Sequence, residues 1–486
     1  MAKRFWNLRG QALSLAQILT VVCPAYVLFG YNQSGLGSLT SLSDWVKHFP
    51  EIDTINTTGV QKSHNATIQG VVIATFTLGA LPGCLSCSYT ADKFGRRPVI
   101  FMGGLLALIG QVVEASAFQL AQMIIGRTIL GVGIGMLSGT VPTWQSECAS
   151  SKNRGKHVVL DGLFIALGYM LQAWINLGFY QFKLGPVTWR APTAIPIVFE
   201  IVLIISIIFL PESPRWLARQ GRTEEARLSL ASFRDANEDA PTITAELAGI
   251  ESSLEETANS ATSLKDLLTM GEDRLLYRFG ICILLQFFQQ MSGGNLISVY
   301  STTIFESGLS LDAQTSRLLS GGVLTWKFLS CFVSFFTIDR LGRRFALMVS
   351  GTGMATWANF LYCTEVAPTR LRVAMSSIST ANHWLWNFVV TMITPVAIDT
   401  IGYKYYIVFT CIGFCIPLSI YFLYPETMGR TLEEIDLIFR ESPSIWATVR
   451  YAKQHPGHDG LGNQDEKTRF GHEEKCEIAM SERVSD

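Results

Sequence analysis

Three amide side chains stand close together within a long uncharged segment of this chain. Gln289, Gln290 and Asn295 lie in the apolar run 279–305. A primary amide both donates and accepts hydrogen bonds, and a polar group left unsatisfied in a bilayer costs several kcal/mol. We therefore expect these amides to face a polar cavity, where they could bind hydroxyl groups. Hydrogen bonding between helices is the alternative, and it satisfies one amide more readily than three.

A second polar set lies in the apolar run 373–398. It contains Asn382, His383, Trp384 and Asn387. The amide and imidazole groups could bond hydroxyls, and an indole ring presents a large apolar face. His383 could also make binding depend on pH, although a neutral, packed imidazole is the reading that its apolar surroundings favour.

The composition is that of a membrane protein. Of 486 residues, 49% are hydrophobic and 16% are charged, against roughly 25% charged in soluble proteins. The 38 basic and 39 acidic side chains give no basic field for a nucleic acid partner. Most cysteines lie in apolar runs, Cys84 and Cys87 included, so we expect no disulfide framework, no metal site and no cofactor. The sequence contains no recognised arrangement of catalytic residues, so we expect the protein not to belong to the common enzyme classes.

Eleven apolar runs are long enough to cross a hydrocarbon core about 30 Å thick. They predict an all-α, multi-pass integral membrane protein. The first run is followed by ten more and has no small-residue cleavage site, so we expect it to be a permanent helix. The runs are 12–31, 67–90, 98–118, 120–143, 158–180, 191–210, 279–305, 318–338, 345–364, 373–398 and 405–424.

Basic residues follow the second, fourth and eighth runs, and this asymmetry predicts the orientation. Positively charged loops stay in the cytoplasm, so these loops and the N-terminus are expected there. The loop 40–66 then lies outside, and it carries two glycosylation sequons, at Asn56 and Asn65. Asn65 stands close to the membrane, so Asn56 is the favoured acceptor. The plasma membrane is the expected location.

Repeated charged motifs divide the chain into two halves around the polar stretch 211–277. This pattern predicts an N-terminal six-helix bundle (1–210), a cytoplasmic central loop (211–277), a C-terminal bundle (278–424) and a cytoplasmic tail (425–486). The motif 91–97 is echoed by 339–344, and the motif 211–215 is echoed by 425–430. Residues after Arg440 show no periodicity and are expected to be irregular.

The repeats place carboxylates and guanidinium groups at the ends of neighbouring helices. Such pairs could form a gating network that holds one orientation of the carrier and breaks in the other. The alternative is that the basic residues only set topology, but the duplicated acidic partners favour the network. Its members are Asp92, Arg96, Glu147, Arg154, Glu212 and Arg215 in the first half, and Asp339, Arg343, Glu365, Arg372, Glu426 and Arg430 in the second.

Together these motifs resemble the sugar porters of the major facilitator superfamily, the fungal members in particular, over residues 29–439. The resemblance implies two pseudo-symmetric bundles, a small sugar or polyol as substrate, a lipid environment, and a monomer. It also implies that Gln289, Gln290 and Asn295 bind sugar, together with His383, Trp384 and Asn387. The motifs are 29–32, 92–97, 126–127, 189–192, 211–215, 289–295, 339–344 and 425–434.

Two departures from the family pattern bear on mechanism. Asn32 stands where proton-linked members commonly carry an aspartate that pairs with the arginine matching Arg127. Because an amide cannot titrate, facilitated diffusion is favoured, with a proton symporter using Asp161 or Glu200 as the alternative. Gly162 and Tyr169 stand where similar porters often place two glutamines, which leaves the identity of the sugar open.

The second half is short by about one helix. The interval from the first charged motif to the following acidic residue spans 55 residues in the first half (92 to 147) and 26 in the second (339 to 365). Only five apolar runs are visible there, and the join falls near 353–357. A truncated or wrongly spliced coding sequence is the favoured explanation. An inactive product and a transporter-like nutrient sensor therefore remain alternatives to a carrier.

Overall fold

The computed structural model describes most of the chain. Its backbone is described for residues 8–149, 154–182, 185–259, 264–271, 273–341, 344, 347–348, 362–363, 366–368, 371–427, 430 and 432–454. Within these ranges the side chains of 154–159, 253, 256–259, 264–265, 307, 334–341, 372–373 and 432–433 are not described.

The first half consists of long apolar helices, and they coincide with the six runs expected there. Helices α1 and α2 join through a π-helical turn, Ile18–Val22, into one span of 26 residues. Among the described residues, eight helices are long and apolar enough to cross a membrane, six of them in this half. The helices are α1 (Gly10–Gln17), α2 (Cys23–Gly35), α4 (Gly59–Phe94), α5 (Arg96–Ala115), α6 (Leu120–Cys148), α7 (Arg154–Phe182), α8 (Val187–Ala194) and α9 (Pro196–Phe209).

The second half contains a broken helix where the sequence predicts a continuous one. Run 279–305 forms α13 (Leu275–Met291) and α14 (Gly294–Thr303), and Gly293 between them has a φ of 79°. Glycine adopts this left-handed conformation without the steric cost of a Cβ atom. The other long helices are α15 (Ala313–Leu341), α18 (Arg372–Ile401) and α19 (Lys404–Leu423). The proposed join at 353–357 lies outside the described residues.

The polar stretch 211–277 is largely helical. It contains α10 (Pro214–Arg219), α11 (Thr223–Arg234) and α12 (Pro241–Asn259), which pack through a small apolar cluster that includes Trp216, Leu230 and Leu247. Part of the expected tail is also ordered into α20 (Leu432–Glu441) and α21 (Thr448–Gln454). The prediction of an irregular segment after Arg440 is therefore wrong for residues up to 454.

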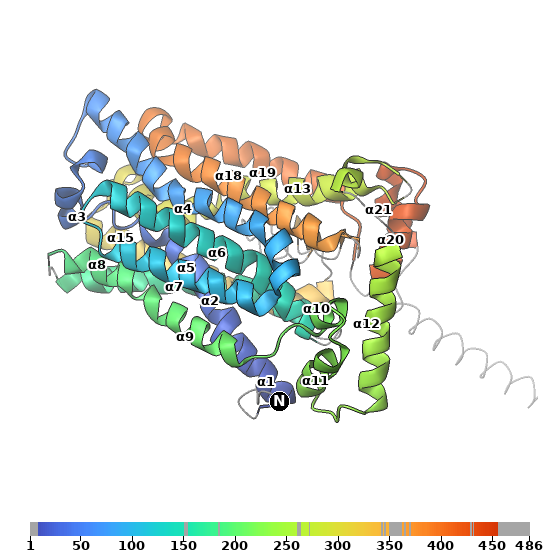
Figure 1. Cartoon of the computed structure of the whole chain (residues 1–486). Coiled ribbons are helices and arrows are strands. Elements are labelled where there is room, and N and C mark those ends of the chain that lie inside the picture. Colours follow the sequence, from blue (N-terminus) through green and yellow to red (C-terminus); the bar gives the residue numbers. More distant parts are fainter. Residues whose placement is uncertain are drawn as a thin grey trace, which may run out of the picture.

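Figure 1 shows the long helices running side by side, with α12 crossing one end of the bundle and α3 (Ser43–His48) at the other. We call these the α12 end and the α3 end. The described residues form helices and connecting turns only, and the prediction of an all-α fold is confirmed. The halves meet where α4 packs on α18 and where α7 packs on α15.

Candidate functional site

Asn295 is the centre of a hydrogen-bond network that draws on both halves. Its Nδ2 donates to Gln290 Oε1 at 3.1 Å and to Asn387 Oδ1 at 2.7 Å. Its Oδ1 accepts from Gln33 Nε2 on α2 at 2.9 Å and from the Tyr169 hydroxyl on α7 at 3.0 Å. Two helices of the second half, α13 and α18, and two of the first, α2 and α7, thus supply the side chains around one amide of α14.

The amides continue to His383 on α18. Gln290 Nε2 lies 3.0 Å from His383 Nδ1 and 3.3 Å from His383 Nε2, and because an amide nitrogen only donates, one of these two ring nitrogens must be the acceptor. The imidazole is then neutral. Gln289 Oε1 lies 3.2 Å from Nδ1, so the neutral tautomer that accepts through Nε2 can donate from Nδ1 to this oxygen. The neutral, packed reading of His383 is the one that this geometry supports.

Trp384 is completely buried and faces the first half. Its ring centroid lies 4.8 Å from that of Phe29 and 5.9 Å from that of Phe76. Its Nε1 donates to Ser138 Oγ on α6 at 3.3 Å. In this arrangement the indole is part of the packing between the halves and lies beside the imidazole of His383, with ring centroids 5.5 Å apart.

Two buried atoms of the network have no hydrogen-bond partner among the described residues. They are Asn387 Nδ2, a donor, and Gln33 Oε1, an acceptor. Leaving such an atom unsatisfied costs about 1–3 kcal/mol. A hydroxyl group can accept from the first and donate to the second, so the network has unused capacity for a hydroxylated ligand.

Three members of the network were not predicted from the sequence. Gln33 follows Asn32 in the first helix, but nothing in the sequence indicates that its side chain reaches Asn295. Tyr169 was noted as a departure from the family pattern, and the structure turns its hydroxyl onto the central amide. Thr391 was also missed, and its hydroxyl donates to Asn387 Oδ1 at 3.1 Å, one turn further along α18.

Each of the expected coupling residues has its own surroundings in the structure. Arg127 is 1% exposed and pairs with Glu114 of α5 at 3.1 Å, a carboxylate that the sequence analysis did not single out. Asn32 is buried, and its Nδ2 has no partner among the described residues. Asp161 is buried against Tyr26 of α2, and Glu200 is fully buried with neither carboxylate oxygen bonded in the described part of the chain.

Charged residues of the first half form a compact cluster at the α12 end. Arg96 makes a two-pronged contact with Glu147, at 2.9 and 3.0 Å, and a further one with Asp92 at 3.3 Å. Asp92 also pairs with Arg219 of α10 at 2.9 Å. These contacts hold α4, α5 and α6 of the first half together and join them to α10 of the central stretch. Arg215 joins none of them.

Glu212 caps the beginning of α5. Its carboxylate accepts from the backbone N–H groups of Arg96 (3.2 Å), Arg97 (3.1 Å) and Ser213 (2.8 Å). Burial raises the pKa of Glu212, and these three donors partly offset that rise. The carboxylate is therefore costly to bury and depends on its donors.

The second half repeats this arrangement where it is described. Glu426 accepts from the backbone N–H of Arg344 at 3.0 Å and from that of Thr427 at 3.1 Å. Tyr362 donates to Pro425 O at 2.9 Å, as Trp144 does to Pro211 O at 3.2 Å. Arg430 donates to Ala452 O. The side chains of Arg154, Asp339, Arg343, Glu365 and Arg372 lie outside the described residues.

The two sequons differ in accessibility. Asn56 is exposed, in a turn whose backbone N–H groups are held by Asp53 Oδ1. These donors lower the pKa of Asp53 more than its burial raises it. Asn65 is 1% exposed inside α4, and its Nδ2 donates to Asp53 O at 2.7 Å. An oligosaccharide at Asn65 would require this contact to break, so the structure favours Asn56.

Contacts between the halves close the α3 end. A Cβ atom on Gly37 would lie 2.0 Å from Val299 O, and one on Gly70 would lie 2.4 Å from Met392 O, so backbone meets backbone at both positions. Arg317 of α15 donates to Ser41 Oγ at 2.7 Å and pairs with Glu306 at 2.8 Å. The Gly37, Gly70 and Ser41 contacts would have to separate for the two halves to move apart at this end.

Comparison with known proteins identifies the family. The sequence profile described as "Sugar (and other) transporter" matches residues 18–362 and 356–439. The chain is 34% identical to "Sugar transporter STL1" of Saccharomyces cerevisiae, over 90% of this chain and 83% of that protein. It is 28% identical to "High-affinity fructose transporter ght6" of Schizosaccharomyces pombe, over 94% and 93% of the two chains.

The fold is also that of a solved transporter. The xylose transporter XylE from E. coli, in a partially occluded inward open conformation, superposes with a TM-score of 0.71 at 19% identity, over 87% of this chain and all of that chain. The predicted relationship to major facilitator sugar porters is confirmed, and the relatives are named as transporters rather than enzymes. The chain belongs to the family of sugar and related transporters, multi-pass membrane proteins of the major facilitator fold.

Proposed function

We propose that this protein carries a sugar or a polyol across a membrane by alternating access, and that the network around Asn295 is its binding site. The observation that carries the proposal is the membership of that network. Side chains of both halves meet on one amide, and they leave a buried donor and a buried acceptor unused. A hydroxylated ligand would satisfy both atoms and bridge the two halves.

The contacts that close the α3 end support a rocking motion. The Gly37 and Gly70 contacts and the hydrogen bond from Arg317 to Ser41 join residues of opposite halves, so the site opens to this side only when the halves separate. The contacts described for the charged cluster at the α12 end join the first half to the central stretch, so they need not change when the halves rock. Orientation follows from the basic loops, with the α12 end and the N-terminus in the cytoplasm, the α3 end outside the plasma membrane, and Asn56 as the glycosylated residue.

Facilitated diffusion is the proposed mode of transport. Asn32 cannot exchange a proton, and Arg127 is neutralised by Glu114 within its own half. The buried carboxylates Glu114, Asp161 and Glu200 favour proton symport as the second candidate, because ionisable groups at membrane depth commonly serve proton transfer. A protonophore separates the two, since it should leave facilitated uptake unchanged and reduce the accumulation driven by symport.

The proposed loss of a helix in the second half decides whether the chain transports. The family profile matches in two pieces whose junction, 356–362, lies at or beside the expected join, which supports the loss. We propose that the chain with the present sequence binds its ligand, and that its uptake activity is impaired until a helix is restored between residues 344 and 365. A nutrient sensor would bind ligand and transport none in either form.

The test is uptake in a host that lacks its own sugar transporters. The chain and a version with the missing helix restored are each supplied with labelled hexoses, pentoses, polyols and disaccharides. We expect the restored version to take up one of these classes, and Asn295→Ala to abolish that uptake at equal surface expression. Uptake that survives Asn295→Ala would contradict the assigned site, and ligand binding without uptake by the restored version would support the sensor.

A further inference from the structure

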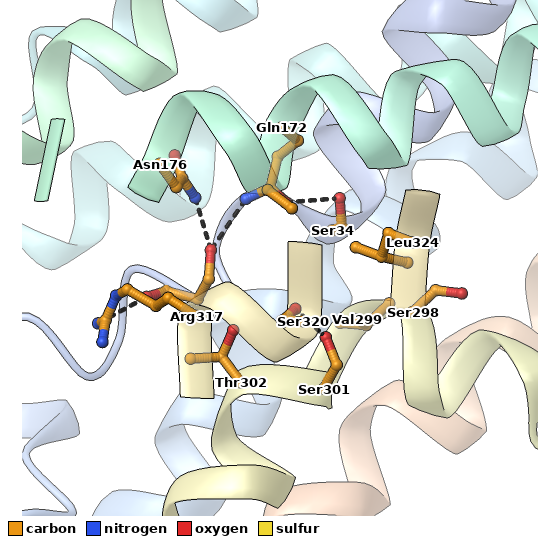
Figure 2. Close-up of a pocket in the computed structure, with 12 residues that line it drawn as sticks. Ser34, Gln172, Asn176, Ser298, Val299, Ser301, Thr302, Arg317, Ser320 and Leu324 are labelled. Atoms are coloured by element: carbon orange, nitrogen blue, oxygen red, sulfur yellow. Dashed lines mark hydrogen bonds between the residues drawn. The ribbon is translucent and has the colours of Figure 1, made fainter. Parts of the chain in front are cut away.

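A small polar pocket lies beside the Asn295 network. Serine, threonine and amide side chains form most of its wall, and it has room for about one water molecule. Gln172 and Asn176 line it from α7, and Ser298 lines it from α14 (Figure 2). Because both halves contribute to the wall, the pocket should widen when the halves separate.

The pocket continues the network along two helices, towards the α3 end. Gln172 comes three residues after Tyr169 on α7, and Ser298 comes three residues after Asn295 on α14. Residues at this spacing share one face of a helix and lie about 4.5 Å apart along its axis. Asn176 is one turn further along α7, which leads to α8, and α8 packs on α3. The network and the pocket therefore form one polar strip about 10 Å long.

Two polar groups of the pocket have hydrogen-bond capacity that the described residues do not use. Ser38 Oγ accepts from Gln172 Nε2 at 2.9 Å and from Asn176 Nδ2 at 2.5 Å, and no described group accepts its own proton. Asn176 is 6% exposed, and its Oδ1 has no partner in the described part of the chain. A ligand hydroxyl group could accept from Ser38 and donate to Asn176, because a hydroxyl does both at once.

The size and charge of the pocket limit what can occupy it. A pyranose ring is several times larger than a water molecule, whereas the terminal CH2OH group of an open carbon chain is narrow and ends in a hydroxyl. The polar strip is also longer than one ring, and an extended chain of hydroxylated carbons is comparable in length. Arg317 lines the pocket and is paired with Glu306 at 2.8 Å, which favours a neutral ligand.

We propose that the ligand is an acyclic polyol such as a pentitol or a hexitol, and that Ser38 and Asn176 bind its terminal hydroxyl group. The Asn295 network would bind the hydroxyl groups at the other end of the same molecule. The pocket then selects for chain length, since a shorter polyol reaches only one of the two places. This inference rests on the proposed binding site and adds to it the shape of the ligand and a second set of contacts.

The test compares ligands that differ in length or in shape on the purified full-length chain. Sorbitol is an extended hexitol, erythritol is a polyol too short to span the strip, and D-glucose holds similar hydroxyl groups on a ring. Binding is measured by the rise in Tm with ligand concentration, which gives Kd without requiring transport. We expect sorbitol to bind at least about tenfold more tightly than erythritol, because it gains two hydrogen bonds, each worth about fivefold.

Substitution of Asn176 assigns that gain to the pocket. Asn176→Leu is similar in size and has no hydrogen-bonding group, so it should raise the Kd of sorbitol at least about fivefold and leave those of erythritol and D-glucose within about twofold. Asn176→Ser keeps a hydroxyl group and should retain part of the affinity for sorbitol. Asn237→Leu is the matched control, because Asn237 is exposed between α11 and α12. If Asn176→Leu does not fold, Asn176→Ser and the comparison of sorbitol with erythritol on the unmodified chain still decide.

The outcomes separate this inference from the proposed function. Equal binding of sorbitol and erythritol, or an affinity for sorbitol that Asn176→Leu leaves unchanged, overturns the role of the pocket and leaves the carrier intact. An equal loss for all three ligands, or binding of D-glucose alone, has the same meaning. Binding of none of the three overturns the pocket, and it overturns the proposed site as well if every sugar and polyol tested above also fails.

Discussion

The Tyr169 hydroxyl donates one of the hydrogen bonds that surround the Asn295 amide, and this makes it a direct probe of the site. Tyr169→Phe removes that donor and keeps the ring. We expect ligand binding to weaken by about fivefold, which corresponds to the roughly 1 kcal/mol of one hydrogen bond. The measurement is Kd from ligand-dependent Tm. Tyr89→Phe is the control, since Tyr89 is exposed on α4 and accepts a hydrogen bond from Lys93 on the same helix. An unchanged Kd for Tyr169→Phe would show that the network does not position Asn295.

Among individual residues, the sequence predicted those whose polar side chains would be costly to leave without hydrogen bonds in a bilayer. Gln290, Asn295 and Asn387 are amides inside apolar runs, and the structure brings them together as that cost implies. Gln33 and Glu114 were missed for a different reason. A residue's contacts across a bundle depend on how each helix is rotated about its axis, and one sequence does not contain that rotation for helices that are apolar on most sides.

Individual helices are fastened at the α12 end by the buried contacts of Arg96. Glu147→Gln removes the charge that faces both prongs of this guanidinium group, while Asp92 remains. Breaking a buried ion pair by changing one partner costs about 3 kcal/mol or more, so we expect a clear fall in the Tm of the purified chain. Glu225→Gln is the matched control, because Glu225 and its partner Arg222 are about half exposed and such pairs contribute roughly 0–1 kcal/mol. Equal effects of the two substitutions would contradict the fastening role.

The length and hydropathy of the apolar runs predicted most of the helices. The features that they did not predict also have a physical explanation. Eight predicted runs appear as helices that could span a membrane, because an apolar stretch of about 20 residues has few other stable forms there. The break at Gly293 was not predicted, because a hydropathy profile does not detect a single residue in the left-handed conformation. Helices α10, α11 and α12 lie in the stretch that was predicted as a central loop. Their polar faces make the stretch polar on average, although they pack together through apolar residues.

The two halves approach most closely at glycines of the α3 end, and the whole molecule should respond to bulk there. Gly70→Trp would force α4 away from α18, since even a Cβ atom would lie 2.4 Å from Met392 O. We expect this variant, made in the version with the helix restored, to bind ligand and to lose at least about tenfold in uptake rate, because the α3 end cannot close. Gly178→Trp is the control, as a Cβ there meets nothing within 4 Å. Full uptake by Gly70→Trp would contradict closure at this position.

The architecture of the whole molecule followed from internal repetition rather than from any single motif. The echo of 211–215 in 425–430 predicted equivalent helix ends, and Glu212 and Glu426 do accept from the backbone at equivalent places. The same spacing argument located the missing helix near 353–357, which lies outside the described residues, so that part stays a prediction. The orientation of one half relative to the other was beyond the sequence, because it is set by contacts such as those of Gly37 and Gly70.

The charged cluster of Asp92, Arg96, Glu147 and Glu212 is complete before residue 260, since every contact described for it is made with residues of the first half or of α10. During biosynthesis this bundle can therefore finish its own internal pairing while the ribosome is still adding the remainder. A defect in the later helices would then leave the first bundle folded and inserted in the membrane. The quality-control machinery would encounter a chain in which only the first half is correctly folded.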